Sequence, residues 1–176
     1  MVSPLLAFVV FLIAIALIFD FINGFHDAAN SISCVVSTRV LPPKYAVYWA
    51  AFFNFVAAFS IGAPVAHTIG TGIVDPKIVE NLLILAALGG AIAWNLITWW
   101  FGIPSSSSHA LIGGLIGAGV VKGGSDVLVW KGIIKTASFI VLSPAIGFVL
   151  GFIFMAIVLN VTRNMSATKA DLSFRR

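Results

Sequence analysis

Long apolar stretches separated by two short polar segments dominate the pattern of this chain. Four stretches have close to the roughly 20 residues that a membrane-spanning helix needs, at 4–22, 45–66, 81–102 and 134–160. Two shorter elements, 25–38 and 107–121, follow the polar segments. At a rise of about 1.5 Å per residue, the element at 107–121 reaches only ~22 Å, less than the roughly 30 Å hydrocarbon core. We therefore expect it to be a half-helix or a re-entrant arm.

The first polar segment interrupts a run that is apolar on both sides, from residue 4 to residue 38. A run of that length exceeds a single membrane span. The pattern therefore predicts a helix break near Asn23 and Gly24. The expected fold is an all-α, polytopic membrane protein with broken or re-entrant half-helices over residues 1–160, followed by a polar, basic tail at 161–176.

Composition places the chain in a lipid bilayer. It is 60% hydrophobic and only 9% charged, and its mean hydropathy is +1.10, far from an ordinary soluble domain. The net charge of +4 comes from basic residues at segment ends and in the tail, which suits lipid headgroups and topology and does not indicate nucleic-acid binding. The single cysteine, Cys34, excludes an internal disulfide and argues against a thiolate metal site.

The second polar segment is a run of four serines that follows Pro104. Ser106, Ser107 and Ser108 can cap a helix that begins near His109. Unpaired N–H groups and the positive end of the helix dipole favour anions there. Three hydroxyls add donors for a tetrahedral oxyanion such as phosphate, and neutral donors also favour its release. The alternative is that the serines only cap the helix.

The first polar segment offers the complementary chemistry. Asp27 and Asn30 are spaced i, i+3, so they share one face of a helix. A carboxylate at membrane depth is a candidate functional group, and with an amide oxygen it suits Na⁺ or a coupling proton. Alternatively, Asp27 caps a helix and faces water. His26, His109 and Asn95 are weaker candidates, because a histidine or asparagine in such a place is more often a hydrogen-bonded structural residue.

These residues resemble a known family. The segment from Phe21 to Ser31 contains Gly-x-x-Asp-x-x-Asn, and the serine run continues through His109-Ala110-Leu111-Ile112-Gly113-Gly114. Both are similar to landmarks of the inorganic phosphate transporter (PiT) family. The resemblance implies a symporter of the plasma membrane that moves inorganic phosphate with Na⁺ or H⁺, needs no other cofactor, and is built from two inverted repeats. By motif, Asp27 and Asn30 fall on the cation and phosphate site, and Ser106–Ser108 on the phosphate-binding helix start.

The sequence departs from that family in one respect, since each motif occurs once. The chain therefore resembles the N-terminal repeat alone, which implies a homodimer, a complementary second half, or a non-transporting half-subunit or fragment. A sulfate permease of the same fold is a further alternative. An intramembrane hydrolase that uses serine, His109 and Asp27 is disfavoured, because no Gly-x-Ser-x-Gly elbow is present; we expect no enzyme activity.

Overall fold

A computed structural model of the protein describes residues 3–60 and 72–166. It divides into two compact units, Met1–Gly132 and Ile133–Arg176. The described residues are almost entirely helical. The first unit contains the helices α1 (Pro4–Ser37), α2 (Pro43–Ser60), α4 (Asn81–Trp100) and α5 (Ser107–Gly123), and the short 3₁₀ turns η1 (Pro76–Ile78) and η2 (Ser125–Val127). Helix α6 (Trp130–Thr162) makes up most of the described part of the second unit.

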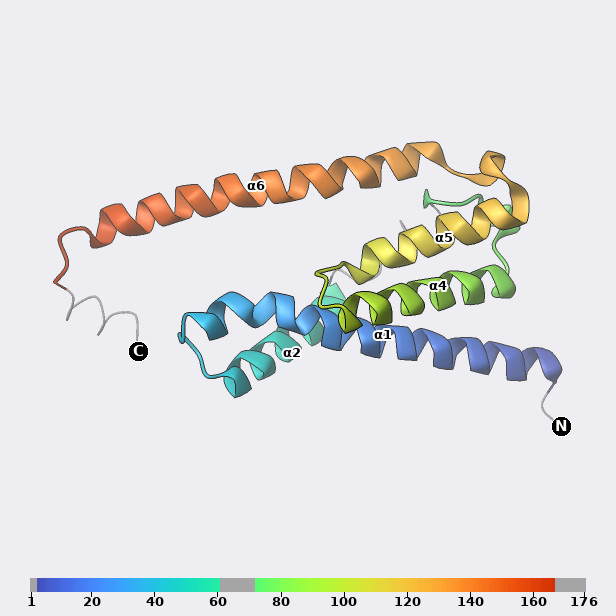
Figure 1. Cartoon of the computed structure of the whole chain (residues 1–176), viewed down its shortest axis with the longest axis horizontal. Helices are drawn as coiled ribbons and strands as arrows, with labels where there is room; N and C mark the ends of the chain where they lie inside the picture. The colour runs from blue at the N-terminus through green and yellow to red at the C-terminus, as the bar shows by residue number, and fades with distance from the viewer. Residues whose placement is uncertain (1–2, 61–71, 167–176) are drawn as a thin grey trace. The chain divides into compact units, whose positions relative to one another are not determined.

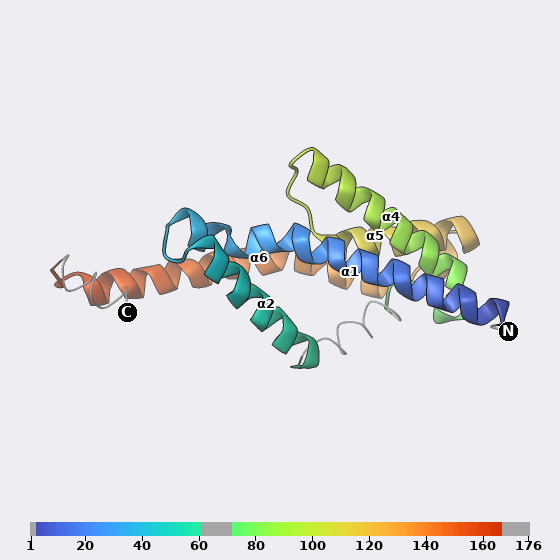
Figure 2. The ribbon, with the colours of Figure 1, turned by 90° about the horizontal axis from the view of Figure 1, so that it is seen from below.

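Three helices form the core of the first unit. α4 and α5 run antiparallel as a helical hairpin, and α1 lies against α4 (Figure 1, Figure 2). Phe19 of α1 packs with Leu88 and Ala91 of α4 at the centre of this core. Partly buried apolar side chains from all three helices surround them, namely Leu12, Ile15, Ala16, Ile84, Ile92, Ala110 and Leu111. Because these positions recur every three or four residues, one stripe of each helix faces the core.

The expected break near Asn23 and Gly24 is wrong. α1 continues through both residues as one helix of 34 residues, about 51 Å long at 1.5 Å per residue. A glycine inside a helix costs only about 1 kcal/mol, whereas a break in lipid leaves backbone groups unpaired at several kcal/mol each. The buried face also continues across the glycine, from Phe19 and Ile22 to His26. The two elements expected at 4–22 and 25–38 are therefore one helix.

The other elements lie close to their expected positions. α4 and α5 begin at Asn81 and Ser107, and α6 extends a few residues beyond 134–160 at both ends. α2 begins two residues before 45, and residues 61–66 of that stretch lie outside the described residues, as do residues 167–176 of the tail. By length and apolar composition, α1, α4 and α6 are each able to cross a membrane.

Two sets of contacts stabilise the base of the α4–α5 hairpin, the end where α4 begins at Asn81 and α5 ends at Gly123. The segment that enters η1 pairs with the segment that leaves η2: Asp75 N–H donates to Val127 O at 2.8 Å, and Val129 N–H donates to Ile73 O at 3.0 Å. Lys122, near the end of α5, reaches Glu80 at 2.6 Å. Its ammonium group also donates to Ile78 O at 2.8 Å. The opposite end of the hairpin, residues 101–106, carries the serine run.

Candidate functional site

Neighbouring serines of the run have different environments. Ser106 is the N-cap of α5, and its Oγ accepts a hydrogen bond from His109 N–H at 3.4 Å. Ser107 is the first helical residue and its side chain is completely buried (0% exposed). Ser108 is exposed, as is the side chain of His109. The expected helix start therefore exists, but only Ser107 points into the protein, while Ser106 caps the helix and Ser108 remains open.

The Asp27/Asn30 pair lies on the continuous part of α1. Asn30 is exposed, and the Asp27 side chain is 45% exposed. His26, next to it, is turned to the buried face, with its Nδ1 3.8 Å from Asp27 Oδ1. Within residues 3–60 and 72–166, no hydrogen bond connects Asp27 or Asn30 to the serine run. The two predicted groups are thus placed near the same end of the unit, but this chain does not enclose them together.

The register between α1 and α4 places two asparagines opposite each other. His26 Nε2 lies 3.4 Å from Thr98 Oγ1, and these residues are 72 positions apart in the sequence. Phe19 and Ala91, which pack in one core cluster, have the same separation. The two helices run in the same direction (Figure 1). Asn23 and Asn95 are also 72 positions apart, and they lie between these two contacts, so the register places them at the same level.

The register of the hairpin adds a serine to this level. Ile103 N–H donates to Thr98 O at 2.8 Å, and farther along the hairpin the backbone at Gly114 lies directly against that of Ala87. The register between these two contacts places Ser106 and Ser107 near the level of Asn95. Ser107 also lies one turn from Ala110 and Leu111, both of which pack on the core cluster. Asn95, Ser107 and the Oδ1 of Asn23 are therefore all buried about one turn beyond the apolar core.

We call this level the polar layer, comprising Asn23, His26, Asn95, Thr98 and Ser107. Several of its polar atoms are buried and have no hydrogen-bond partner among the described residues: Asn23 Oδ1, His26 Nδ1, Ser107 Oγ, and both Oδ1 and Nδ2 of Asn95. Thr98 is the satisfied member, because its hydroxyl reaches the carbonyls of Trp94 and Asn95 at 3.0 and 3.1 Å. A buried polar group without a partner costs about 1–3 kcal/mol. A polar ligand that pairs with these atoms would remove that cost, so the layer is suited to bind one.

Neither Asn23 nor Thr98 is among the site residues that the motifs indicate. Asn23 falls at the expected helix break, and Thr98 falls within an apolar helix. A signal was nevertheless present, because Asn23–His26 and Asn95–Thr98 are both polar pairs at i, i+3 in otherwise apolar segments. Two such pairs favour two helices that face each other through polar side chains.

Comparison with known proteins identifies the family. The chain matches the phosphate transporter family over residues 23–174. It belongs to that family. It is 60% identical over 164 residues to a probable low-affinity inorganic phosphate transporter of Rhizobium meliloti (strain 1021), a match that covers 93% of this chain and 49% of the relative. A relative of the same name from Bacillus subtilis (strain 168) is 50% identical over 174 residues, covering 98% of this chain and 52% of the relative.

A solved structure, described as the sodium-dependent phosphate transporter, has the same fold. Its TM-score is 0.75 at 32% sequence identity, over 84% of this chain and 39% of that one. The chain thus spans about half the length of the two relatives and less of the solved structure. The family resemblance seen in the motifs is confirmed, as is the helical membrane fold. The protein is a multi-pass protein of the plasma membrane, and its family consists of transport proteins rather than enzymes.

Proposed function

We propose that this chain forms half of a phosphate transport path, in which phosphate binds where the polar layer meets the N-terminus of α5. The relatives are named as phosphate transporters, which supports the substrate. The observation that carries the proposal is the set of buried, unpartnered polar atoms beside a helix N-terminus. Such a terminus favours anions through its free N–H groups and its dipole.

The polar layer offers several neutral donors to a tetrahedral oxyanion. Asn95 Nδ2 and the Ser107 hydroxyl are buried donors without a partner among the described residues, and Ser106 and Ser108 flank Ser107 at the end of the hairpin where residues 101–106 connect α4 to α5. Binding phosphate would satisfy these groups and remove their desolvation cost. Because none of the donors carries a fixed charge, the anion is held without a strong ion pair, which suits a carrier that must release its cargo.

Asp27 and Asn30 provide the site for the coupling cation in this proposal. They lie one to two turns beyond Asn23 on α1, and they present a carboxylate and an amide oxygen on one open helix face. A cation there would offset the negative charge of phosphate at membrane depth. The solved relative is described as sodium-dependent, which favours Na⁺ over H⁺ as the coupling ion.

A second half would complete the path. Asp27, Asn30 and Ser108 remain open in this chain, although an ionisable group at membrane depth is normally covered by protein or lines an aqueous cavity. The relatives contain about as much sequence again as the part that this chain matches. We therefore propose that the chain acts with a complementary half, with a homodimer as the alternative.

Uptake of radiolabelled phosphate into proteoliposomes tests the proposal. The chain would be reconstituted alone and together with the part of the Rhizobium meliloti relative that lies outside the match, under imposed Na⁺ or pH gradients. We expect gradient-driven uptake by the complete assembly, with unlabelled phosphate competing better than sulfate. Equal uptake without any gradient, or stronger competition by sulfate, would contradict the coupled phosphate mechanism.

Replacing the carboxylate isolates the coupling step. Asp27→Asn should abolish gradient-driven uptake while leaving membrane insertion intact. Asp20→Asn is the matched control, because Asp20 is also an exposed aspartate of α1 but lies outside the motif and about two turns away. Normal transport by the Asp27→Asn variant would show that the coupling ion binds elsewhere.

A further inference from the structure

A hollow of 290 Å³ lies between α1 and α2, close to the turn that joins them. α2 leaves this turn at an angle to α1 (Figure 2), and both helices line the hollow. Most of its lining is apolar, including Val35 of α1, Leu41 of the turn, and Trp49, Ala50 and Phe53 of α2. We call this hollow the α1–α2 cleft.

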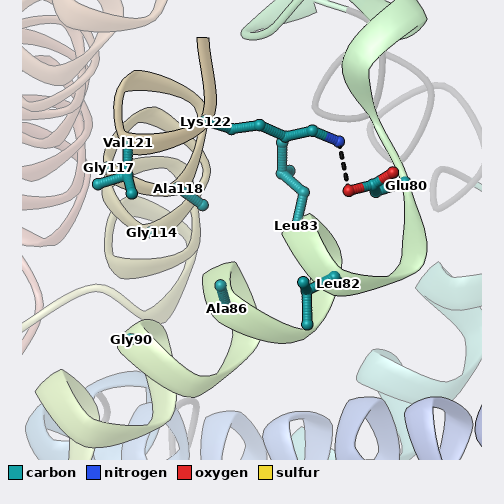
Figure 3. A pocket seen from close by; sticks show the side chains of 10 residues that line it. All are labelled: Glu80, Leu82, Leu83, Ala86, Gly90, Gly114, Gly117, Ala118, Val121 and Lys122. Carbon is teal, nitrogen blue, oxygen red and sulfur yellow. Dashed lines mark ion pairs between the residues drawn. The ribbon is translucent and has the colours of Figure 1, made fainter. Parts of the chain in front are cut away.

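The turn beside the cleft carries two positive charges. Arg39 and Lys44 are both exposed, and the segment 28–74 contains no aspartate or glutamate. Within the part of the chain that the structure describes, neither side chain has an ion-pair partner. Lys122, by contrast, is paired with Glu80 at the base of the hairpin (Figure 3). The turn therefore presents two uncompensated cations next to an apolar cleft.

Arg39 occupies a backbone position that glycine usually fills. The end of α1 is closed by two hydrogen bonds, from Arg39 N–H to Val36 O and from Val40 N–H to Val35 O, both 3.1 Å long. This pairing is a Schellman motif, which needs a left-handed residue after the helix and favours glycine there. Arg39 adopts that conformation with φ 59°. An arginine held in a strained conformation points to a role for its side chain.

The position and length of the cleft match one leaflet of a bilayer. Tyr45, Tyr48 and Trp49 are exposed at the start of α2, and such aromatic residues lie at the membrane interface. Asn54 is the last residue of α2 that lines the cleft. The ten residues from Lys44 to Asn54 span about 15 Å, which is half of the roughly 30 Å hydrocarbon core. The cleft thus extends from the interface toward the middle of the bilayer.

We propose that the α1–α2 cleft binds an anionic phospholipid, with the lipid phosphate at Arg39 and Lys44 and one acyl chain in the cleft. A guanidinium forms paired hydrogen bonds with phosphate oxygens, and basic residues beside a membrane helix attract anionic headgroups. A zwitterionic lipid brings a third cation to the two already present. Inorganic phosphate leaves the apolar cleft unfilled, and an apolar helix leaves both charges unpaired. The proposal does not depend on the proposed function, because its residues lie outside the polar layer.

Lipid retention tests the charge requirement. The chain, alone and together with the part of the Rhizobium meliloti relative outside the match, is purified in mild detergent with phosphatidylglycerol or phosphatidylcholine of the same acyl chains. Native mass spectrometry then counts the bound lipids. Phosphatidylglycerol should be retained preferentially. Replacing both Arg39 and Lys44 by Gln should weaken its binding roughly thirtyfold, since each cation contributes about fivefold.

Two lysines of α6 provide the matched control. Lys131 and Lys135 are also exposed and four positions apart, but they lie away from the cleft in the sequence. Replacing both by Gln removes the same charge and should change the binding of phosphatidylglycerol little. Equal losses in the two double variants, or equal retention of the two lipids, overturns the proposal. So does retention by the chain alone that is lost in the complete assembly, because another segment then occupies the cleft.

Filling the cleft tests the place of the acyl chain. Ala50 lines the cleft and is half-buried, whereas Ala51 is exposed and lies outside it. Ala50→Phe displaces two or three CH₂ groups of the acyl chain and should weaken lipid binding about tenfold, while Ala51→Phe should not. Melting temperatures without lipid check that both variants fold. Equal retention by the two variants, or displacement of the lipid by excess inorganic phosphate, overturns the proposal.

A photoreactive lipid needs no substitution. Phosphatidylglycerol with a diazirine in its acyl chain, supplied at one lipid per chain, should label residues 45–54 of α2 and do so less when unlabelled phosphatidylglycerol competes. Labelling of other helices alone, or labelling that phosphatidylcholine suppresses equally well, overturns the proposal.

Discussion

Removing the Ser107 hydroxyl should stabilise this protein while it weakens phosphate binding. The Ser107 side chain is completely buried, and its Oγ has no partner among the described residues. An unsatisfied buried hydroxyl costs about 1–3 kcal/mol, and alanine is also the better helix former by a few tenths of a kcal/mol. After subtracting the small loss of packing, Ser107→Ala should gain about 1 kcal/mol, or roughly 2–4 °C in melting temperature for a chain of this size.

The adjacent serine provides a control of opposite sign. Ser106 accepts the capping hydrogen bond from His109 N–H, and loss of an N-cap side chain typically costs about 1 kcal/mol. The same chemical change one residue earlier should therefore lower the melting temperature by roughly 2–4 °C. The sign of the difference does not depend on the absolute stability in a given detergent.

Thermal unfolding of the purified variants, with and without phosphate, measures both effects. Phosphate that binds the folded state should raise the melting temperature of the unmodified chain or its assembly, because a hundredfold excess over the dissociation constant stabilises that state by about 2.7 kcal/mol. The Ser107→Ala variant should start from a higher melting temperature and gain less from phosphate. If Ser107→Ala is destabilised as much as Ser106→Ala, the Ser107 hydroxyl is hydrogen-bonded in the folded protein and the polar layer is not unsatisfied.

Two further substitutions test the same helices. Asn95→Leu, which removes both unpartnered atoms of a fully buried amide, should leave the melting temperature unchanged or higher and abolish the stabilisation by phosphate; a full phosphate response would contradict the proposed site. Gly114→Ala should cost about 1–3 kcal/mol by overpacking against Ala87, whereas Gly113→Ala, in open space, should be neutral or stabilising by up to about 1 kcal/mol. Equal melting temperatures for the two alanine variants would show that the hairpin is not closely packed at Gly114.

Hydropathy predicts the class of this fold well because the hydrocarbon core requires nearly every residue of a membrane span to be apolar. The long apolar stretches indicated the positions of α4 and α6, and the serine run indicated the start of α5, since a cap needs a side-chain oxygen before the first turn. The prediction of a helix break near Gly24 was wrong for a physical reason. Length alone cannot distinguish a broken helix from a long one that extends beyond the hydrocarbon.

The sequence indicates polar faces at Asn23–His26 and Asn95–Thr98, but not that they lie at one level, because the level depends on the register between helices. Asn95 and Ser107 were named as candidates for different reasons, one as a buried amide and the other as part of an anion site. Only the contacts at Thr98 and Gly114 place them at one level. A helix pattern fixes which face a residue occupies, but not the height at which a neighbouring helix meets it.

The same geometry explains how the proposed anion site can remain unsatisfied when it is empty. The hairpin is fixed at its base by the Lys122–Glu80 pair and by backbone hydrogen bonds on either side of it, and its middle is packed through Gly114. Helix α1 contacts the same layer from the other side through His26 and Thr98. The hairpin contacts outside the layer and the His26–Thr98 contact within it thus hold its helices apart, so that its unpaired groups do not reach one another. Binding of a polar ligand then removes a cost that the fold itself maintains, which is how a carrier built from neutral donors gains affinity without a fixed charge.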